Sequence, residues 1–122
     1  MDQIPMKLRL ALIALVTLAF VACSGTRDAA PVFYKPTGTL QCAPSKTTQA
    51  GLEAELSALQ GAGATVIASN CAKDGEAYIT LCGAQNGDLF SVTVSPSSAP
   101  LALQLGYKPA SQYSSARPIA CQ

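Results

Sequence analysis

The fold is decided by residues 64–94, whose sequence is ATVIASNCAKDGEAYITLCGAQNGDLFSVTV. Two dipeptides divide this stretch, Asp74-Gly75 and Asn86-Gly87. Such dipeptides are strong local signals for hairpin turns, because glycine and asparagine tolerate the positive φ that a two-residue turn requires. The spacing therefore predicts three antiparallel strands joined by two tight turns. We expect Cys71 near the end of the first strand and Cys82 near the end of the second.

The two turns set the strand register independently, and the two registers agree. Both put the same apolar side chains on one face of the sheet: Val66, Ala68, Ile79, Leu81, Phe90, Val92 and Val94. The more polar face receives Thr65, Ile67, Ser69, Tyr78, Thr80, Ser91 and Thr93. One apolar and one polar face are typical of an antiparallel sheet that helices cover on one side.

Two helices are expected to cover the apolar face. The first spans residues 47–60, where leucines recur at helical spacing, Thr47 or Thr48 can act as N-cap and a glycine follows. The second has Ser98 as its N-cap, Pro100 in its first turn and Gly106 as its stop. The predicted fold class is therefore α+β: a small helix–three-stranded antiparallel meander–helix domain that is stapled by disulfides.

Residues 1–22 have the features of a signal peptide. A positively charged start is followed by an apolar run from Leu10 to Ala22, which is short for a membrane span of about 20 residues. The run ends in Phe20-Val21-Ala22-Cys23, which resembles the lipobox of bacterial lipoproteins, with Phe20 where Leu is commonest. The resemblance implies cleavage before Cys23 and attachment of fatty acyl chains such as palmitate, and two or more chains give a stable membrane anchor.

The residue after Cys23 is Ser24, and the resemblance then implies sorting to the outer membrane, facing the periplasm. The alternative is an ordinary cleaved signal peptide in which Cys23 is incidental. Residues 23–41 contain proline and glycine without helical periodicity and are interpreted as a lipidated flexible tether. The disulfide-stabilised domain is accordingly assigned to residues 42–122.

The chain contains five cysteines, an odd number for an exported protein. Acylation of Cys23 leaves an even set for disulfides, Cys42, Cys71, Cys82 and Cys121. The expected register places Cys71 and Cys82 about 13 Å apart along adjacent strands, which excludes a bond between them, since bonded α-carbons lie within about 7 Å. The lengths of the first helix and strand favour the pairs Cys42–Cys71 and Cys82–Cys121. The alternative is Cys42–Cys82 with Cys71–Cys121.

The sequence offers little chemistry for catalysis. It contains no histidine, so the commonest general base and the commonest metal ligand are missing. Asp74, Glu76 and Asp88 are expected at turn tips, with Asp74 and Asp88 at opposite ends of the sheet, and therefore in no single site. After cleavage the acidic and basic residues balance, which gives no electrostatic footprint for nucleic acid. We predict no catalytic residue, no cofactor and no metal site.

These features predict a lipid-anchored cell-envelope protein with a structural or protein-interaction role and no enzymatic activity. Its partners would be the membrane, through the lipid anchor, and an envelope protein. The alternative is a periplasmic ligand-binding or inhibitory module that uses the polar sheet face around Tyr78 and Thr80, or the edge of the third strand. An enzyme with an unrecognised site is the least favoured class.

Overall fold

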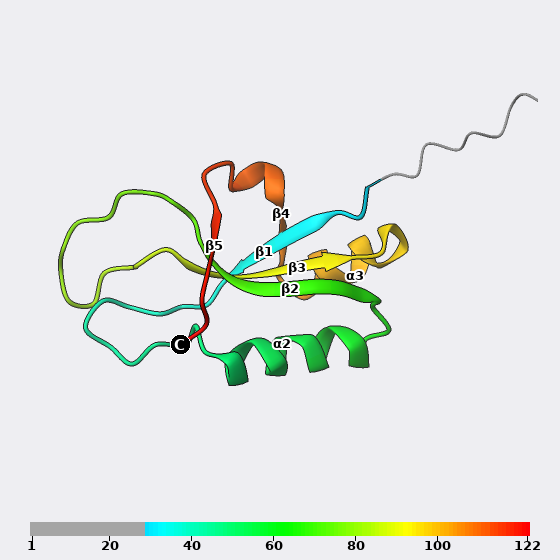
Figure 1. The fold of residues 1–122 in the computed structure, drawn as a ribbon, viewed down its shortest axis with the longest axis horizontal. Coiled ribbons are helices and arrows are strands. Elements are labelled where there is room, and N and C mark those ends of the chain that lie inside the picture. The colour runs from blue at the N-terminus through cyan, green and yellow to red at the C-terminus, as the bar shows by residue number, and fades with distance from the viewer. Residues whose placement is uncertain (1–28) are drawn as a thin grey trace, which may run out of the picture.

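The computed structural model describes residues 29–122 and shows a mixed α+β fold built on one sheet. Its strands are β1 (Val32–Pro36), β2 (Val66–Lys73), β3 (Asp88–Val94), β4 (Lys108–Pro109) and β5 (Arg117–Ile119). They lie in the order β4-β1-β3-β2-β5, and every neighbouring pair is antiparallel (Figure 1). The remaining elements are the helices α2 (Gln49–Gly61) and α3 (Ala99–Gln104) and the short 3₁₀ turns η1 (Pro96–Ser98) and η2 (Ala110–Gln112). The predicted α+β class is confirmed, but the three-stranded meander is wrong.

The predicted middle strand is absent, and residues 74–87 form a loop instead, which we call the β2–β3 loop. β2 and β3 pair directly, from Val66 opposite Val94 to Lys73 opposite Asp88. The loop makes its backbone hydrogen bonds outside the sheet: Gln41 N donates to Ala84 O at 2.8 Å, and Gly83 N donates to Gln41 O at 3.0 Å. A segment whose backbone groups are satisfied in this way has no need of a strand partner.

The two glycine dipeptides mark the ends of this loop rather than two hairpins. Gly75 and Gly87 both adopt positive φ, at 77° and 78°. Asp74 N then donates to Gly87 O at 2.9 Å, which brings the two ends of the loop together. The positive φ of these two glycines was therefore predictable from the sequence. Asp74 and Asn86 do not share it, so neither dipeptide forms the predicted two-residue hairpin turn.

The face assignment is correct for β3 and wrong for most of β2. Phe90, Val92 and Val94 are buried against the helices, as predicted. In β2 the register shifts between Val66 and Ala68, which is a β-bulge around Ile67. One extra residue moves every following side chain to the opposite face. Cys71, which was expected on the polar face, is therefore fully buried in the core.

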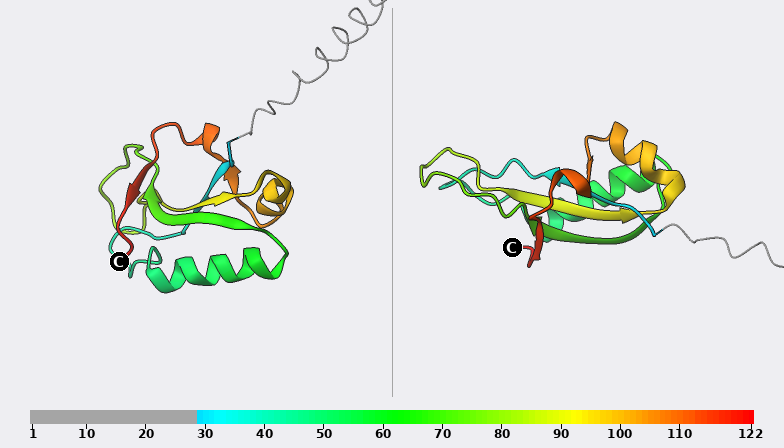
Figure 2. Two further views of the ribbon diagram at one scale, coloured as in Figure 1. Left: turned by 45° about the vertical axis from the view of Figure 1, so that its right-hand side comes forward. Right: turned by 90° about the horizontal axis from the view of Figure 1, so that it is seen from above.

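Helix α2 forms where it was predicted and lies along one face of the sheet (Figures 1 and 2). Thr48 is its N-cap, and its side chain accepts a hydrogen bond from Gly51 N at 2.9 Å. Gly51 itself allows close packing, because a Cβ there would lie 2.7 Å from Lys46 O and 3.1 Å from the Phe90 ring. Leu52 and Leu59 are buried beneath the sheet. The cost of glycine in the helix is thus offset by the approach of β3.

The second predicted helix is present as η1 followed by α3. Ser98 occupies the N-cap position of α3, but its hydroxyl accepts a hydrogen bond from Thr65 N at 2.9 Å instead of capping the helix. Ala102 is buried in the core cluster with Leu59 of α2 and Val94 of β3. Both helices therefore cover the same face, and Ser98 ties α3 to the start of β2.

The folded domain begins earlier in the chain than predicted, because β1 is an internal strand that pairs with both β3 and β4. Phe33 is buried opposite Val92 and belongs to the core. Lys35 Nζ also lies 3.1 Å from Glu55 Oε2 of α2. The second half of the predicted 23–41 tether is therefore structured. The lipobox resemblance at Phe20–Cys23 falls outside the described residues.

Residues 108–119 cross the face of the sheet that α2 does not cover, and we call this segment the strap (Figures 1 and 2). It begins as β4 beside β1 and ends as β5 beside β2, so it supplies both edge strands. Between them the ring of Tyr113 lies 5.5 Å from the ring of Tyr34. Such short strands carry no hydrophobic periodicity, so no local pattern in residues 108–119 predicted them.

The two disulfides join Cys42 to Cys82 and Cys71 to Cys121, with Cα–Cα distances of 5.1 and 5.3 Å. The favoured pairs Cys42–Cys71 and Cys82–Cys121 were therefore wrong, and the alternative pairing is the one observed. The favoured pairing assumed that a middle strand carries Cys82 to the far end of the sheet. Without that strand, Cys82 stays beside Cys42. The exclusion of a Cys71–Cys82 bond is confirmed.

The two bonds differ in exposure, and we expect them to be reduced in order. Cys42 and Cys82 are both exposed, whereas Cys71 is completely buried. Exposed disulfides are more readily attacked, so a mild phosphine reductant should open Cys42–Cys82 first. Alkylation followed by peptide mass mapping measures the order. In guanidinium chloride both bonds should react together, and prior reduction of Cys71–Cys121 in the native protein would contradict the observed burial.

Candidate functional site

The β2–β3 loop forms one wall of a pocket of about 220 Å³, which we call the loop pocket. The other contributions come from the segment after β1, from the start of β3 and from Tyr113 of the strap. The complete lining is Pro36, Gly38, Thr39, Leu40, Asp74, Tyr78, Gln85, Asn86, Gly87, Asp88, Leu89 and Tyr113. Apolar and aromatic walls with a few polar groups are typical of small-molecule sites.

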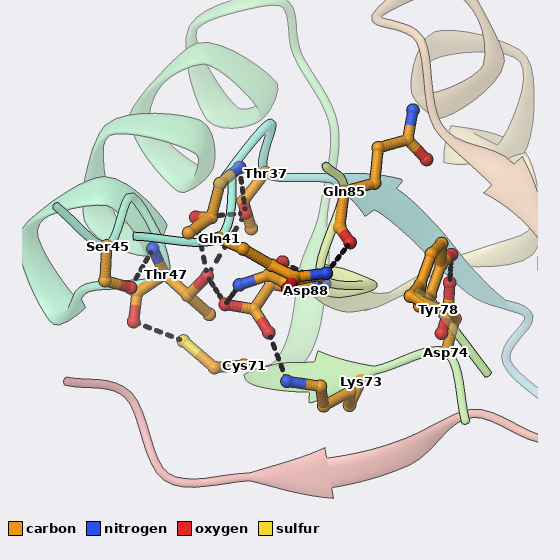
Figure 3. A network of polar contacts seen from close by, with 12 residues as sticks. Thr37, Gln41, Ser45, Thr47, Cys71, Lys73, Asp74, Tyr78, Gln85 and Asp88 are labelled. Atoms are coloured by element: carbon orange, nitrogen blue, oxygen red, sulfur yellow. Dashed lines mark hydrogen bonds and ion pairs between the residues drawn. The ribbon is translucent and has the colours of Figure 1, made fainter. Parts of the chain in front are cut away.

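Asp88 fixes the start of β3 at the edge of this pocket (Figure 3). Its Oδ2 accepts hydrogen bonds from Thr47 Oγ1 at 2.7 Å and from Asn86 Nδ2 at 3.0 Å. Its Oδ1 lies 3.2 Å from Lys73 Nζ, directly across the β2–β3 pair. The buried carboxylate therefore connects the segment before α2, the end of the loop and the last residue of β2.

Three threonine hydroxyls continue the polar network away from Asp88. Thr37, Thr39 and Thr47 lie within 2.9 to 3.2 Å of one another. Thr39 Oγ1 also accepts from Lys46 N at 2.9 Å, which ties the segment after β1 to the start of α2. Figure 3 also marks the 3.9 Å contact between Cys71 Sγ and Thr47 O, which is a packing contact because a disulfide sulfur carries no proton. The network holds the pocket wall in place.

Asp74 organises the first turn of the β2–β3 loop. Its Oδ1 accepts a hydrogen bond from Glu76 N at 2.9 Å, and its Oδ2 accepts a short hydrogen bond from the hydroxyl of Tyr78. This hydrogen bond to a carboxylate raises the pKa of Tyr78 to about 12, because ionising the phenol would place two negative charges together. The ring of Tyr78 is thereby fixed at the pocket.

Gln41 clamps the tip of the β2–β3 loop with its side chain. Its Nε2 donates to Ile79 O at 2.7 Å and to Gln85 O at 3.1 Å, and its Oε1 accepts from Leu81 N at 3.0 Å. The neighbouring Cys42–Cys82 bond adds a covalent link at the same place. Nothing in the sequence around Gln41 signals this role, since a single glutamine has no motif.

The structure changes the placement of two predicted groups of residues. Asp74 and Asp88, which were expected at opposite ends of the sheet, both line the loop pocket because the intervening strand does not exist. Tyr78 lines it too, whereas Thr80 is exposed in the loop. Of the cysteines, Cys42 and Cys82 brace the loop and Cys71 and Cys121 secure β2 to the C-terminus, whereas Cys23 lies outside the described residues.

Replacing Asp88 by alanine should destabilise the protein. The change removes the acceptor for Thr47, Asn86 and Lys73 and leaves the buried threonine hydroxyl with fewer partners. Hydrogen bonds to charged groups suggest a loss of about 2–3 kcal/mol in the free energy of unfolding. Urea denaturation followed by circular dichroism measures the loss. Glu53→Ala, on the exposed side of α2, is the control and should change stability by about 0.5 kcal/mol or less; equal effects of both variants would contradict the role of Asp88.

Tyr78 should titrate at a higher pH than an ordinary tyrosine. The pKa of its phenol is raised to about 12, so its favourable contribution to folding is complete below pH 10 and is lost as the pH rises through 12. Carbon-13 NMR of the tyrosine ring carbons, assigned with Tyr78→Phe, measures this titration. Asp74→Asn should move the midpoint back toward 10. A midpoint of 10 in the unmodified protein would show that the hydrogen bond to Asp74 does not form.

Three further findings bear on the site. Within residues 29–122, no helix is long and apolar enough to cross a membrane. The same part of the chain brings no three acidic or cysteine side chains together in a group suited to a metal ion. No protein-family model, curated protein or solved structure matches the chain.

Proposed function

We propose that this chain is a lipid-anchored protein of the bacterial cell envelope with a structural or protein-interaction role and no catalytic activity. One observation carries the interaction role, namely the exposed apolar side chains at the tip of the β2–β3 loop and on the adjoining segment after β1. Leu40, Ile79 and Leu81 have exposed fractions of 41%, 71% and 58%, and the Gln41 clamp joins the segments that bear them. Grouped apolar residues at a surface favour contact with a partner. We call these three residues the loop tip.

The loop tip is held in one arrangement before any partner arrives. The Cys42–Cys82 bond and the Gln41 clamp restrain it on one side, and Asp74 with Tyr78 restrains the loop nearer the sheet. A preorganised loop loses less conformational entropy on binding than a flexible one does. This bracing supports a binding role for the exposed apolar residues.

The direction of the loop tip favours a protein partner over the bilayer. Val32 pairs with Thr93 at one end of the sheet, whereas Lys73 and Asp88 flank the loop at the other end. Figure 1 shows β1 beginning at the opposite end of the molecule from the loop. A lipid on Cys23 would therefore place the membrane near the start of β1 and leave the loop tip facing the periplasm. Outer-membrane sorting through Ser24 belongs to the same proposal.

The second candidate function is a periplasmic ligand-binding or inhibitory module. The observation in its favour is the loop pocket, where Tyr78, Tyr113 and two carboxylates meet. This function needs no lipid anchor and no protein partner. The third class, an enzyme, gains no support from these residues.

The anchor is tested by the intact mass of the protein extracted from membranes of its native cells. We expect a chain that begins at Cys23, carries acyl chains and gains four hydrogens when its two disulfides are reduced. Cys23→Ser should leave the signal uncleaved or the protein unlipidated. A wild-type chain without lipid would overturn the anchor and favour the second candidate.

The interaction role is tested in the same cells with a photo-crosslinking amino acid at Ile79. The matched control site is Leu103 on α3, which is apolar and 51% exposed. We expect one discrete crosslinked envelope protein from position 79, none from position 103, and loss of the product in Leu81→Glu. Identical products from both sites, or crosslinks to lipid alone, would contradict a protein partner at the loop tip.

A further inference from the structure

We propose that the loop pocket binds a small organic ammonium group, with Asp74 as its counter-charge and the rings of Tyr78 and Tyr113 as its aromatic contacts. The inference deepens the second candidate function by naming a class of ligand. It depends neither on the lipid anchor nor on a protein partner at the loop tip.

Asp74 is a buried carboxylate in the pocket without a charged partner among the described residues. Its residue is only 7% exposed, and both of its hydrogen-bond donors, the Tyr78 hydroxyl and Glu76 N, are uncharged. Within residues 29–122 the ion pairs are Lys35–Glu55 and Lys73–Asp88, so no described lysine or arginine neutralises Asp74. A buried carboxylate without a counter-charge is unfavourable, and a cation that enters the pocket relieves this.

Asp88 lines the same pocket but differs from Asp74, because Lys73 already neutralises its charge. The other nearby cation is Lys46, whose Nζ would lie 3.8 Å from a Cβ on Gly38. It does not line the pocket and is not in an ion pair with a described carboxylate. The attraction for a cation is therefore localised at the Asp74 side of the pocket.

Two tyrosines, Tyr78 and Tyr113, line the pocket together with Asp74. The hydroxyl of Tyr78 donates a hydrogen bond to the Asp74 carboxylate, which holds the Tyr78 ring at the pocket. Tyr113 lines the pocket together with Asp74, and burial together with the negative charge of Asp74 raises the pKa of Tyr113. The contact between the rings of Tyr113 and Tyr34 restrains the Tyr113 ring. Aromatic faces attract organic cations, and a carboxylate beside two rings is the chemistry of ammonium recognition.

The size and lining of the pocket suit a small organic cation. A volume of about 220 Å³ accommodates an alkylated ammonium group but not a large ligand. Pro36, Leu40 and Leu89 supply apolar surface for the alkyl groups. An inorganic cation prefers several oxygen ligands, and the described residues offer no group of three metal-binding side chains here. The lining thus favours an alkylated ammonium over a divalent metal ion.

The test is an NMR titration of the full chain, purified in a non-ionic detergent, with tetramethylammonium chloride. The amides of Glu76 and Gly87 adjoin Asp74 and report on the site. We expect saturable shifts of these amides with tetramethylammonium. The uncharged tert-butanol, which has a similar shape, and sodium chloride at equal ionic strength should give none. Equal saturable shifts with tert-butanol, or no saturable shift with tetramethylammonium, would overturn the proposal.

Variants of Asp74 and Tyr113 test whether these side chains bind the ammonium group. Asp74→Asn should weaken tetramethylammonium binding by at least about tenfold, whereas Glu53→Gln, which changes an exposed acid on α2, should leave it unchanged. If Asp74→Asn alters the fold, Tyr113→Leu decides the matter, because it keeps the carboxylate and should weaken binding by several fold. Wild-type affinity in a folded Asp74→Asn protein or in Tyr113→Leu would overturn the proposal. The crosslink from position 79 is measured separately, so failure of amine binding leaves that result intact.

Discussion

The contact between Asp88 and its three donors is the constraint on which this structure depends. Lys73 and Asp88 form the last pair of the β2–β3 ladder, and the loop leaves the sheet directly beyond them. Thr47 and Asn86 approach the same carboxylate from the segment before α2 and from the end of the loop. A buried charge with every donor in place fixes the relative position of segments that are far apart in the sequence. The pocket exists because these segments meet there.

Features that depend on neighbouring residues were predicted correctly from the sequence, whereas the pairing of strands far apart in the chain was not. The leucines of α2, its threonine cap and the buried side chains of β3 follow from periodicity within single segments. The positive φ at Gly75 and Gly87 was also foreseeable from the residue types. The absence of a middle strand between those turns was not foreseeable. Gln41, about forty residues earlier in the chain, makes side-chain hydrogen bonds to the backbone of residues 79–85 in place of a strand partner. No local pattern encodes these hydrogen bonds.

The candidate site was missed for the same reason. The sequence analysis placed a strand between Asp74 and Asp88. The structure has a loop there, and both residues line one pocket. The bulge around Ile67 had a similar effect on β2, since it moved Cys71 from the expected polar face into the core, where it bonds to Cys121. The strap that carries Tyr113 over the sheet has no periodic signal at all. Its place is set by the short β4 and β5 pairings and by contact with Tyr34.

The two disulfides interleave along the chain, because Cys71 lies between Cys42 and Cys82. The ring closed by Cys42 and Cys82 overlaps the ring closed by Cys71 and Cys121 along the chain. A single peptide-bond cleavage anywhere between residues 42 and 121 therefore leaves both pieces joined by at least one bond. A protease that cuts between residues 71 and 82 meets both links at once, whereas the pairs Cys42–Cys71 and Cys82–Cys121 would have let such a cut separate the molecule. The exposed residues 75–82 therefore stay linked to the domain by both disulfides after such a cut.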